Sequence, residues 1–523
     1  MSSLNSNMSS NSNLSFDEHR WIINIRRTLE EELENDAEIP VCIFNVPKAL
    51  MTSDPDSYTP QEVAIGPYHH WRPELYEMER YKLAAAKRTQ KKIQSLKFQH
   101  IVDHLSKLEL KIRACYHKFL DFSNETLTWM MAIDASFLLE FLEIYAIKEG
   151  IAITRVSSRS MSHLVDYAGR KSAHNAILRD VAMLENQIPL FVLRKILEVQ
   201  LSSLELADDM LCSMLLGFCK ELSPFKLMQD IPKIHIPQCA HLLDYLYDMI
   251  VPKVEAPPEI ISEADDQPEA MEGPVRLLKR LLFSRPCKVI LKLPWTILSN
   301  LPGFSILKQP LQHLFFSQDQ EEIKPENENS DNEVNRPPLV EEITIPCVTE
   351  LSKSGVCFAP TTGNILSITF DIKAVTLYLP VISFDVNTEV VLRNLVAFEA
   401  SNASGPLVFT RYTELMNGII DTEEDVKFLR EKGIILNRLK SDGEVANLWN
   451  GMSKSIRLTK VPFLDKVIED VNKYYNQRWT VKVGKFMKRY VFGSWQFLTL
   501  LAAVFLLLLM TLQAFCSVYR CSR

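Results

Sequence analysis

One stretch near the C-terminus constrains the fold most. From Val491 through Trp495 and Leu508 to Tyr519 the chain carries no Asp, Glu, Lys, Arg or His. At 1.5 Å of rise per residue these 29 residues would form a helix of about 43 Å, whereas the hydrocarbon core of a bilayer is about 30 Å thick. We therefore expect residues 481–523 to form a basic juxtamembrane stretch and a single transmembrane anchor, with the lipid bilayer as a partner of this helix.

The charges that flank this stretch predict its orientation. The basic residues are Lys482, Lys485, Lys488 and Arg489 before it, and Arg520 and Arg523 after it. Positive charge gathers on the cytoplasmic side of a span, so we expect a tail-anchored, single-pass membrane protein with a cytosolic body. The choice between plasma membrane and endomembrane stays open. The sequons at Asn7, Asn124 and Asn402 would suit a lumenal body instead, and their use is also open.

Composition divides the remaining chain into four parts. We expect a disordered Ser/Asn-rich tail (1–16), a helical N-terminal part (17–254), acidic loops around a basic apolar segment (255–338) and an α+β part (339–480). The net charge of −7 gives no reason to expect a nucleic-acid partner. The ten cysteines form no C-x-x-C pair and no cluster with zinc spacing, so we predict neither a metal site nor a cofactor.

Hydrophobic periodicity predicts a fold that is mainly α with a small β element (α+β). Helical spacing covers 73–148, 175–200, 389–399 and 421–436, with Pro189 kinking or dividing the second of these stretches. Short β-branched runs at 344–348, 356–359, 365–372 and 375–380 predict strands. The expected molecule is a helical body with a few strands and one C-terminal transmembrane helix.

Three polar groups are candidates for chemistry. His69 and His70 lie in a Pro/Gly-rich turn with Glu79 nearby, and histidine is a common metal ligand and general base. Asp134 lies inside an apolar helix, where burial would raise the pKa of a carboxylate that finds no partner. Both features are also explained structurally, since adjacent histidines rarely point to one centre and a buried Asp can pair with a single cation.

The third group is Glu185, Asn186 and Gln187, which stand side by side in an apolar stretch that ends at Pro189. Leaving three such side chains buried without hydrogen bonds would cost a few kcal/mol each, so neighbouring elements must satisfy them. They either support the helix kink at Pro189 or form a recognition or catalytic site.

A basic and apolar segment covers residues 275–316, including Arg276, Lys279 and Arg280. Its acidic flanks suggest two interpretations. It packs on the body while its charges pair with those flanks, or it is a switch that binds lipid or a partner when released.

Ordered motifs along the chain resemble the plant family known as domain of unknown function 247, also called uncharacterised protein family 0481. They are Ile43-Phe-Asn-Val-Pro47, Tyr58-Thr-Pro60, Ile65-Gly-Pro-Tyr-His-His70, Met78-Glu79 with Lys82, Asp134 with Phe137, Asp180, Met183-Leu-Glu-Asn-Gln-Ile-Pro189, and Arg393-Asn-Leu395. Two positions differ from the commonest family pattern: Trp71 stands where Gly is commoner, and Leu190 where an aromatic residue is commoner. Both differences affect packing and remove no polar group. The resemblance implies a plant membrane protein of unknown activity and transfers no catalytic residue.

The sequence therefore predicts a membrane-tethered, non-enzymatic interaction or signalling protein that binds unidentified protein partners. No phosphate-binding loop, H-E-x-x-H, G-x-S-x-G or dinucleotide fingerprint is present. The alternative is a hydrolase or transferase of unrecognised type that uses the region around His69 and His70. This alternative requires the candidate groups to converge in one cleft.

Overall fold

The computed structural model describes residues 21–23, 25–26, 29–30, 40–93, 96–148, 151–152, 170–226, 239–252, 343–402, 405–452, 459–478 and 495–518. The chain divides into a first unit, Met1–Lys253 with Leu339–Asn472, and a second unit, Val254–Pro338 with Lys473–Arg523. The predicted tail (1–16), the basic segment (275–316) and the juxtamembrane lysines lie outside the described residues. The finer division predicted from composition stays a prediction.

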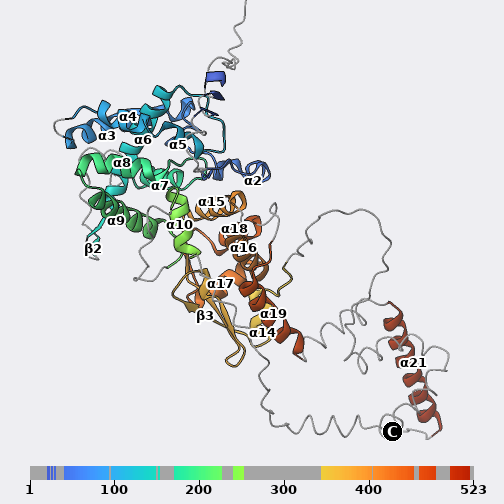
Figure 1. Ribbon diagram of the computed structural model, residues 1–523. Helices are drawn as coiled ribbons and strands as arrows, with labels where there is room; N and C mark the ends of the chain where they lie inside the picture. The colour runs from blue at the N-terminus through green and yellow to red at the C-terminus, as the bar shows by residue number, and fades with distance from the viewer. Residues whose placement is uncertain are drawn as a thin grey trace, which may run out of the picture. The chain divides into compact units, whose positions relative to one another are not determined.

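The N-terminal part of the first unit is helical (Figure 1). Its helices are α2 (Lys48–Ser53), α3 (Glu79–Lys92), α4 (Gln99–Ser106), α5 (Glu109–Ala114), α6 (Asn124–Leu142), α7 (Arg170–Val181), α8 (Leu190–Leu201), α9 (Leu204–Leu222) and α10 (Leu242–Ile250). Helix α6 is the centre of this part, and it packs against α3, α4 and α8. It begins where the Ser123 hydroxyl accepts a hydrogen bond from the Thr126 amide. Fourteen of its nineteen residues are buried, because neighbouring helices cover it on several sides.

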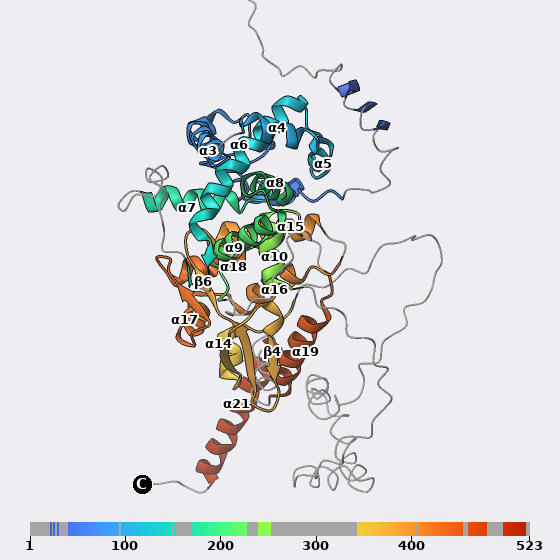
Figure 2. The same cartoon turned by 60° about the vertical axis from the view of Figure 1, so that its left-hand side comes forward.

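The C-terminal part of the first unit combines helices with short strands (Figure 2). Its helices are α14 (Val348–Lys353), α15 (Thr388–Ser401), α16 (Val408–Ile419), α17 (Glu423–Glu431), α18 (Asp442–Met452) and α19 (Pro462–Gln477). Its strands are β3 (Cys357–Thr361), β4 (Thr369–Asp371), β5 (Thr376–Pro380), β6 (Ile382–Phe384) and β7 (Ile435–Asn437). Its core contains Phe384, Tyr412 and Trp449, all of them fully buried.

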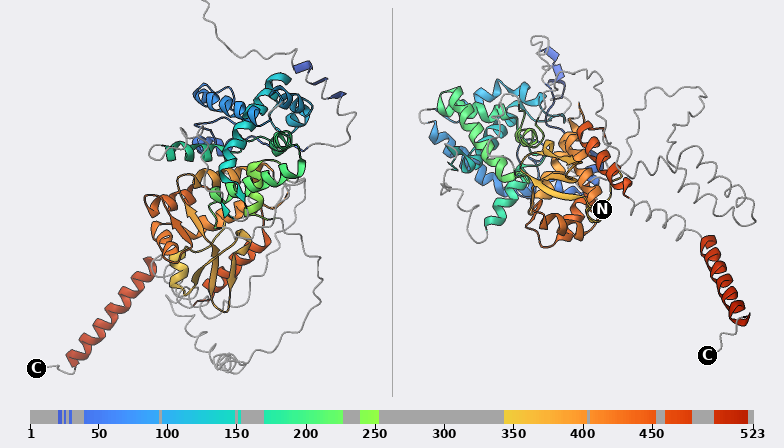
Figure 3. Two further views of the ribbon diagram at one scale, coloured as in Figure 1. Left: turned by 90° about the vertical axis from the view of Figure 1, so that its left-hand side faces the viewer. Right: turned by 90° about the horizontal axis from the view of Figure 1, so that it is seen from below.

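The strands form small sheets. Strand β5 pairs in parallel with β3 and antiparallel with β4, so the order is β3-β5-β4. Strands β6 and β7 form a separate parallel pair, and β1 (Ile147–Lys148) pairs with β2 (Ile151–Ala152). Helices thus predominate in the described chain, and the few strands confirm the expected small β element (Figure 3).

Three local predictions differ from the structure. The stretch predicted as one helix over 175–200 is two helices, α7 and α8, separated by irregular chain that ends at Pro189. Val348 begins helix α14 rather than ending a strand, and the stretch 421–436 ends as strand β7. Gly433 separates α17 from β7 with φ +73°, a conformation that glycine adopts without a Cβ clash and that ends the helix.

The predicted transmembrane anchor is wrong. Helix α21 (Trp495–Val518) forms in this region, and its described apolar side chains, such as Phe505 and Leu508, are exposed. Within the described ranges, no helix combines the length and the apolar character that crossing a bilayer requires. The expected single-pass membrane location, and the span from Val491 to Tyr519 on which it depended, are therefore not supported.

Candidate functional site

An irregular segment, residues 61–70, crosses the interior of the first unit. Val63 and Ile65 are fully buried although neither belongs to a helix or a strand. Buried backbone amides in such a segment must find hydrogen-bond partners outside regular secondary structure. Here side chains from α6, from the end of α7 and from the irregular chain before Pro189 supply them, and two of these side chains, Asp134 and Asn186, are predicted site residues.

Asp180, at the end of α7, accepts three of these hydrogen bonds. The backbone amides of Gln61, Glu62 and Val63 lie 3.0, 2.6 and 3.0 Å from its Oδ2. Its Oδ1 pairs with Arg179 at 3.1 Å. Burial raises the pKa of Asp180, while these amides and Arg179 act against that rise. Asp180 therefore holds the start of the segment as an N-cap residue holds a helix.

Asn186 and Gln187 complete this framework. Asn186 Oδ1 accepts from the Ile65 amide at 2.6 Å, and its Nδ2 donates to the carbonyls of Val63 and Asp180, both at 2.9 Å. Gln187 Nε2 donates to the carbonyls of Val181 and Met183, and its Oε1 accepts from the Leu243 amide. Both carboxamides lie in the irregular chain before Pro189, not within a helix as predicted, and they satisfy backbone that the helices leave unpaired.

Asp134 lies deeper, in α6, and forms a buried ion pair. Its Oδ1 lies 2.9 Å from Lys82 Nζ, and its Oδ2 accepts from the Gly66 amide at 2.9 Å. Lys82 also pairs with Glu79 at 2.7 Å. Burial would lower the pKa of Lys82, but Asp134 and Glu79 outweigh it, and the pKa is raised. Because both Asp134 oxygens are engaged with donors, this carboxylate holds α3 and the segment 61–70 on α6.

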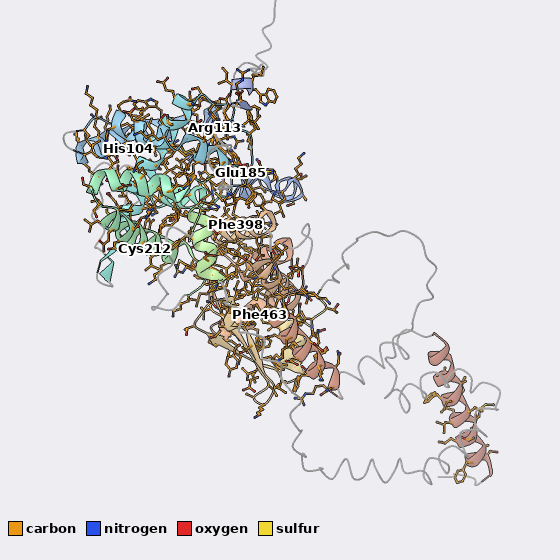
Figure 4. All side chains as sticks on the ribbon, viewed as in Figure 1. His104, Arg113, Glu185, Cys212, Phe398 and Phe463 are labelled. Atoms are coloured by element: carbon orange, nitrogen blue, oxygen red, sulfur yellow. The ribbon has the colours of Figure 1, made fainter. Side chains whose placement is uncertain are left out.

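The two histidines face different groups. His69 Nε2 lies 3.5 Å from Glu185 Oε2, which is long for a hydrogen bond but close enough for an ion pair when the imidazole is protonated. Burial opposes the ionisation of Glu185, but His69, the Val46 amide at 2.9 Å and Asn45 overcome it, and the pKa of Glu185 is lowered. Glu185 lies within the first unit among side chains of its N-terminal part (Figure 4).

The pKa of His70 responds to the buried pair of Asp134 and Lys82. Burial lowers the pKa of His70, Lys82 lowers it further, and Asp134 acts in the opposite direction. Its ring packs edge-on against Trp71, with 4.6 Å between centroids. The predicted residues therefore form two clusters, one of Lys82, Glu79 and Asp134 beside His70, and one of His69 with Glu185. The hydrolase or transferase alternative required these groups to converge at one place, and among the described residues they lie in two clusters.

The outer side of the same turn carries exposed aromatic residues. Trp71 is 60% exposed and stacks on Phe122 with centroids 5.9 Å apart. Tyr76, 47% exposed, lies with its hydroxyl 3.5 Å from the Trp71 carbonyl. Arg72 pairs with Glu74 at 3.1 Å, with both side chains at least a third exposed. We call Trp71, Arg72, Glu74 and Tyr76 the Trp71 patch.

Sequence reasoning missed three residues of this framework. Lys82, Asp180 and Asn394 were not among the candidates, although all three lie in the family motifs. Asn394, in α15, accepts from the Leu184 amide at 2.9 Å and donates to the carbonyls of Ser57 and Val390. A polar residue inside an apolar helical run was the available signal, and the same signal had selected Asp134.

Hollow space lies elsewhere in the first unit. A cavity of about 100 Å³ is lined by Arg88, Thr89, Lys92, Ser136, Leu139, Glu140, Glu143 and Gln200. Across it, Arg88 pairs with Glu140 at 2.9 Å, and Lys92 pairs with Glu143. No predicted site residue lines this cavity. Over the described chain, no three His, Cys, Asp or Glu side chains gather in a way that could hold a metal ion.

Comparison with known proteins places the chain in a family. A putative UPF0481 protein of Arabidopsis thaliana is 53% identical over 522 residues, with 96% of each chain covered. A second UPF0481 protein from the same plant is 26% identical over 495 residues, covering 92% of this chain and 87% of the relative. No solved structure matches. The family model described as plant protein of unknown function matches residues 43–509, which confirms the resemblance seen in the motifs: the chain belongs to the DUF247 family.

Proposed function

We propose that this protein is a non-enzymatic interaction protein whose helical body presents a binding surface to a protein partner. One observation carries the proposal: three of the polar candidates for chemistry, Asp134, Asn186 and Gln187, are engaged in internal hydrogen bonds, while the adjoining Trp71 is largely exposed. Asp134, Asn186 and Gln187 each have at least two protein partners. Their bonds fix the backbone that leads into the turn of the Trp71 patch.

The Trp71 patch has the composition of a binding hot spot. Trp, Tyr and Arg dominate such sites, because they combine a large contact area with few rotatable bonds or with several donors. Trp71 rests on Phe122 and His70, so its ring is held before a partner arrives and little side-chain entropy is lost on binding. The buried framework beneath it explains why this patch is rigid without any catalytic role for the framework.

The test compares two substitutions of exposed apolar residues in the full-length protein. Trp71→Ala removes the centre of the patch, whereas Leu206→Ala, at a residue 55% exposed on α9, is the matched control. Photo-crosslinking from position 76 in plant cells should join wild type and Leu206→Ala to the same partner. Trp71→Ala should lower the yield about tenfold or more, because truncating a hot-spot aromatic costs at least about 1–2 kcal/mol.

Equal crosslinking by Trp71→Ala and Leu206→Ala would contradict the proposal for this surface. Circular dichroism of both variants provides the folding control. Since each side chain is exposed, we expect the free energy of unfolding to change by less than about 0.5 kcal/mol.

A second candidate, a hydrolase or transferase, is favoured by one observation: His69 Nε2 faces Glu185 without a hydrogen-bond partner among the described residues. A carboxylate that orients a histidine is a common device for general base catalysis. The test is turnover on a panel of esters and phosphate esters. Loss of a measured turnover in His69→Asn, but not in the control His100→Asn, would favour this candidate over the interaction protein.

A further inference from the structure

Two cysteines distant in sequence lie next to each other beside this framework. The amides of Cys42 and Ile43 both donate to the Cys115 carbonyl, at 3.0 and 2.8 Å, and Ile43 forms a parallel β-bridge with Tyr116. The Cys42 Sγ lies 3.7 Å from the same carbonyl. Both residues are free thiols. The extended segment around residue 43 therefore lies along the chain that leaves α5.

This backbone geometry suits a covalent link. Cys42 and Cys115 each precede a residue of the bridged pair by one position, so their Cα atoms are about 5 Å apart, the spacing of neighbouring strands. A disulfide needs a Cα separation of about 4.4–6.8 Å. We propose that Cys42 and Cys115 form a reversible disulfide when the protein meets a hydroperoxide, and that this bond locks the segment around residue 43 onto α5.

The two thiols have different roles. The hydrogen bond from the Cys42 thiol lowers the pKa of Cys115, with burial opposing this effect and the Lys111 ammonium assisting it. The hydrogen bond to Cys115, and then burial, raise the pKa of Cys42. The lowered pKa makes Cys115 the thiol of the pair that loses its proton more readily, so we assign it as the nucleophile. Cys42 is partly exposed, which opens the pair to a small oxidant.

The chemistry takes two steps. The Cys115 thiolate attacks one oxygen of hydrogen peroxide, the O–O bond breaks and hydroxide leaves, which gives a sulfenic acid on Cys115. Hydroxide takes up the proton that Cys115 lost. The Cys42 sulfur then attacks the Cys115 sulfur, the S–O bond breaks, and the Cys42 thiol proton leaves with the second hydroxide as water. In sum, two thiols and one peroxide give one disulfide and two waters, and a dithiol reverses the change.

The bond would strengthen contacts that already hold the segment. The Ile43 carbonyl accepts from the Tyr68 hydroxyl at 2.9 Å and from the His117 amide at 3.0 Å. His241 Nε2 lies 3.0 Å from the Cys42 carbonyl. Because the link would close a long loop between residues 42 and 115, it should restrict the unfolded chain strongly.

The experiment treats the purified full-length protein with hydrogen peroxide, blocks remaining thiols with N-ethylmaleimide, and maps peptides by mass spectrometry. We expect a Cys42–Cys115 linked peptide that disappears with dithiothreitol. We also expect the thermal unfolding midpoint to rise by about 3–8 °C in the oxidised protein. Recovery of Cys42 and Cys115 without a link, under conditions that oxidise the exposed Cys357, would overturn the proposal.

Variants separate this pair from the other cysteines. Cys115→Ser should abolish both the linked peptide and the shift in midpoint, whereas the control Cys357→Ser should keep both. A shift that persists in Cys115→Ser would show that another pair causes it and would overturn the assignment. If Cys115→Ser does not fold, the linked peptide of the wild type decides the question.

Discussion

The segment 61–70 and the aromatic core of the C-terminal part satisfy the hydrogen bonds of their buried backbone by different means. In the segment, buried amides are bonded to side chains: Asp180, Asn186 and Asp134 accept from five consecutive or nearly consecutive residues. In the C-terminal core most buried backbone groups bond within helices α16 and α18 or between β6 and β7, and Glu399 accepts from the first amides of α16; the side chains between these elements are chiefly apolar.

The contrast extends to polar atoms on the aromatic rings. Tyr116 donates its hydroxyl to the Gln187 carbonyl at 3.0 Å. Within the described chain, the Tyr412 hydroxyl and Trp449 Nε1 are buried without a hydrogen-bond partner, although their rings pack edge-to-face at 5.9 Å. Where the backbone is regular, its amides and carbonyls mostly pair with each other, and the core can be filled with apolar side chains chosen for their fit. Where the backbone is irregular, buried polar side chains are required at defined positions to bond to it.

Removing a carboxylate from the N-terminal part should give the largest effect. Asp134→Ala leaves Lys82 fully buried without its closest buried counter-charge and leaves the Gly66 amide without an acceptor. We expect the free energy of unfolding to fall by about 3–5 kcal/mol, measured by urea denaturation.

The double variant Lys82→Met with Asp134→Leu is the control for this effect. It removes both charges and fills the space with apolar atoms, so it should regain most of the lost free energy. A loss below about 1 kcal/mol in Asp134→Ala would break the comparison, because the segment 61–70 would then not depend on its buried acceptors.

A smaller effect should appear as a dependence on pH. His241 is fully buried, accepts from the Asp244 amide through Nδ1 and donates through Nε2 to the Cys42 carbonyl. Burial lowers the pKa of His241 to about 4 from 6.5. As the pH falls below 6.5 the unfolded chain takes up this proton first, so stability present above pH 6.5 is lost as the pH falls toward 4. The loss attributable to this one group is about 3 kcal/mol.

His241→Asn tests this assignment. Asparagine caps a helix but does not titrate in this range, so the variant should be less stable at pH 7.5 and should lose less stability between pH 6.5 and 4. Equal slopes for the variant and the wild type, in denaturant unfolding at a series of pH values, would assign the dependence to other groups.

The smallest predicted difference compares two glycines with positive φ. Gly66 has φ +78°, and a Cβ there would lie 2.7 Å from the Gln187 carbonyl oxygen. Gly433, with φ +73°, has no atom within 4 Å of the corresponding position. Both Gly→Ala substitutions incur backbone strain, but only Gly66→Ala also displaces backbone. We expect Gly66→Ala to cost about 1–2 kcal/mol more in free energy of unfolding than Gly433→Ala. Equal costs would show that the segment moves aside freely.

Sequence reasoning identified those features of the fold that local sequence determines. Apolar periodicity predicted the mainly helical body, and Pro189 marked the division between α7 and α8, because proline cannot donate a hydrogen bond inside a helix. Their polar side chains within apolar stretches identified Asp134 and Asn186 as unusual positions. Periodicity could not show that α7 ends several residues before Pro189. The apolar residues there keep a helical spacing although the backbone is irregular.

The partners of the candidate residues were beyond local reasoning. His69 contacts Glu185 and Gly66 contacts Asp134 across long separations in sequence. The local sequence around either residue of a pair does not predict its partner. The predicted C-terminal span is wrong as well: among the helices of the described residues, none is long and apolar enough to cross a bilayer.

Hydrogen–deuterium exchange of the amides from Gln61 to Gly66 tests the central claim most directly. If buried side chains hold this irregular segment as firmly as secondary structure, its amides should exchange as slowly as those of helix α6, with protection that Asp134→Ala reduces. Exchange as fast as in the exposed turn at Lys373 and Ala374, in the folded wild-type protein, would contradict it.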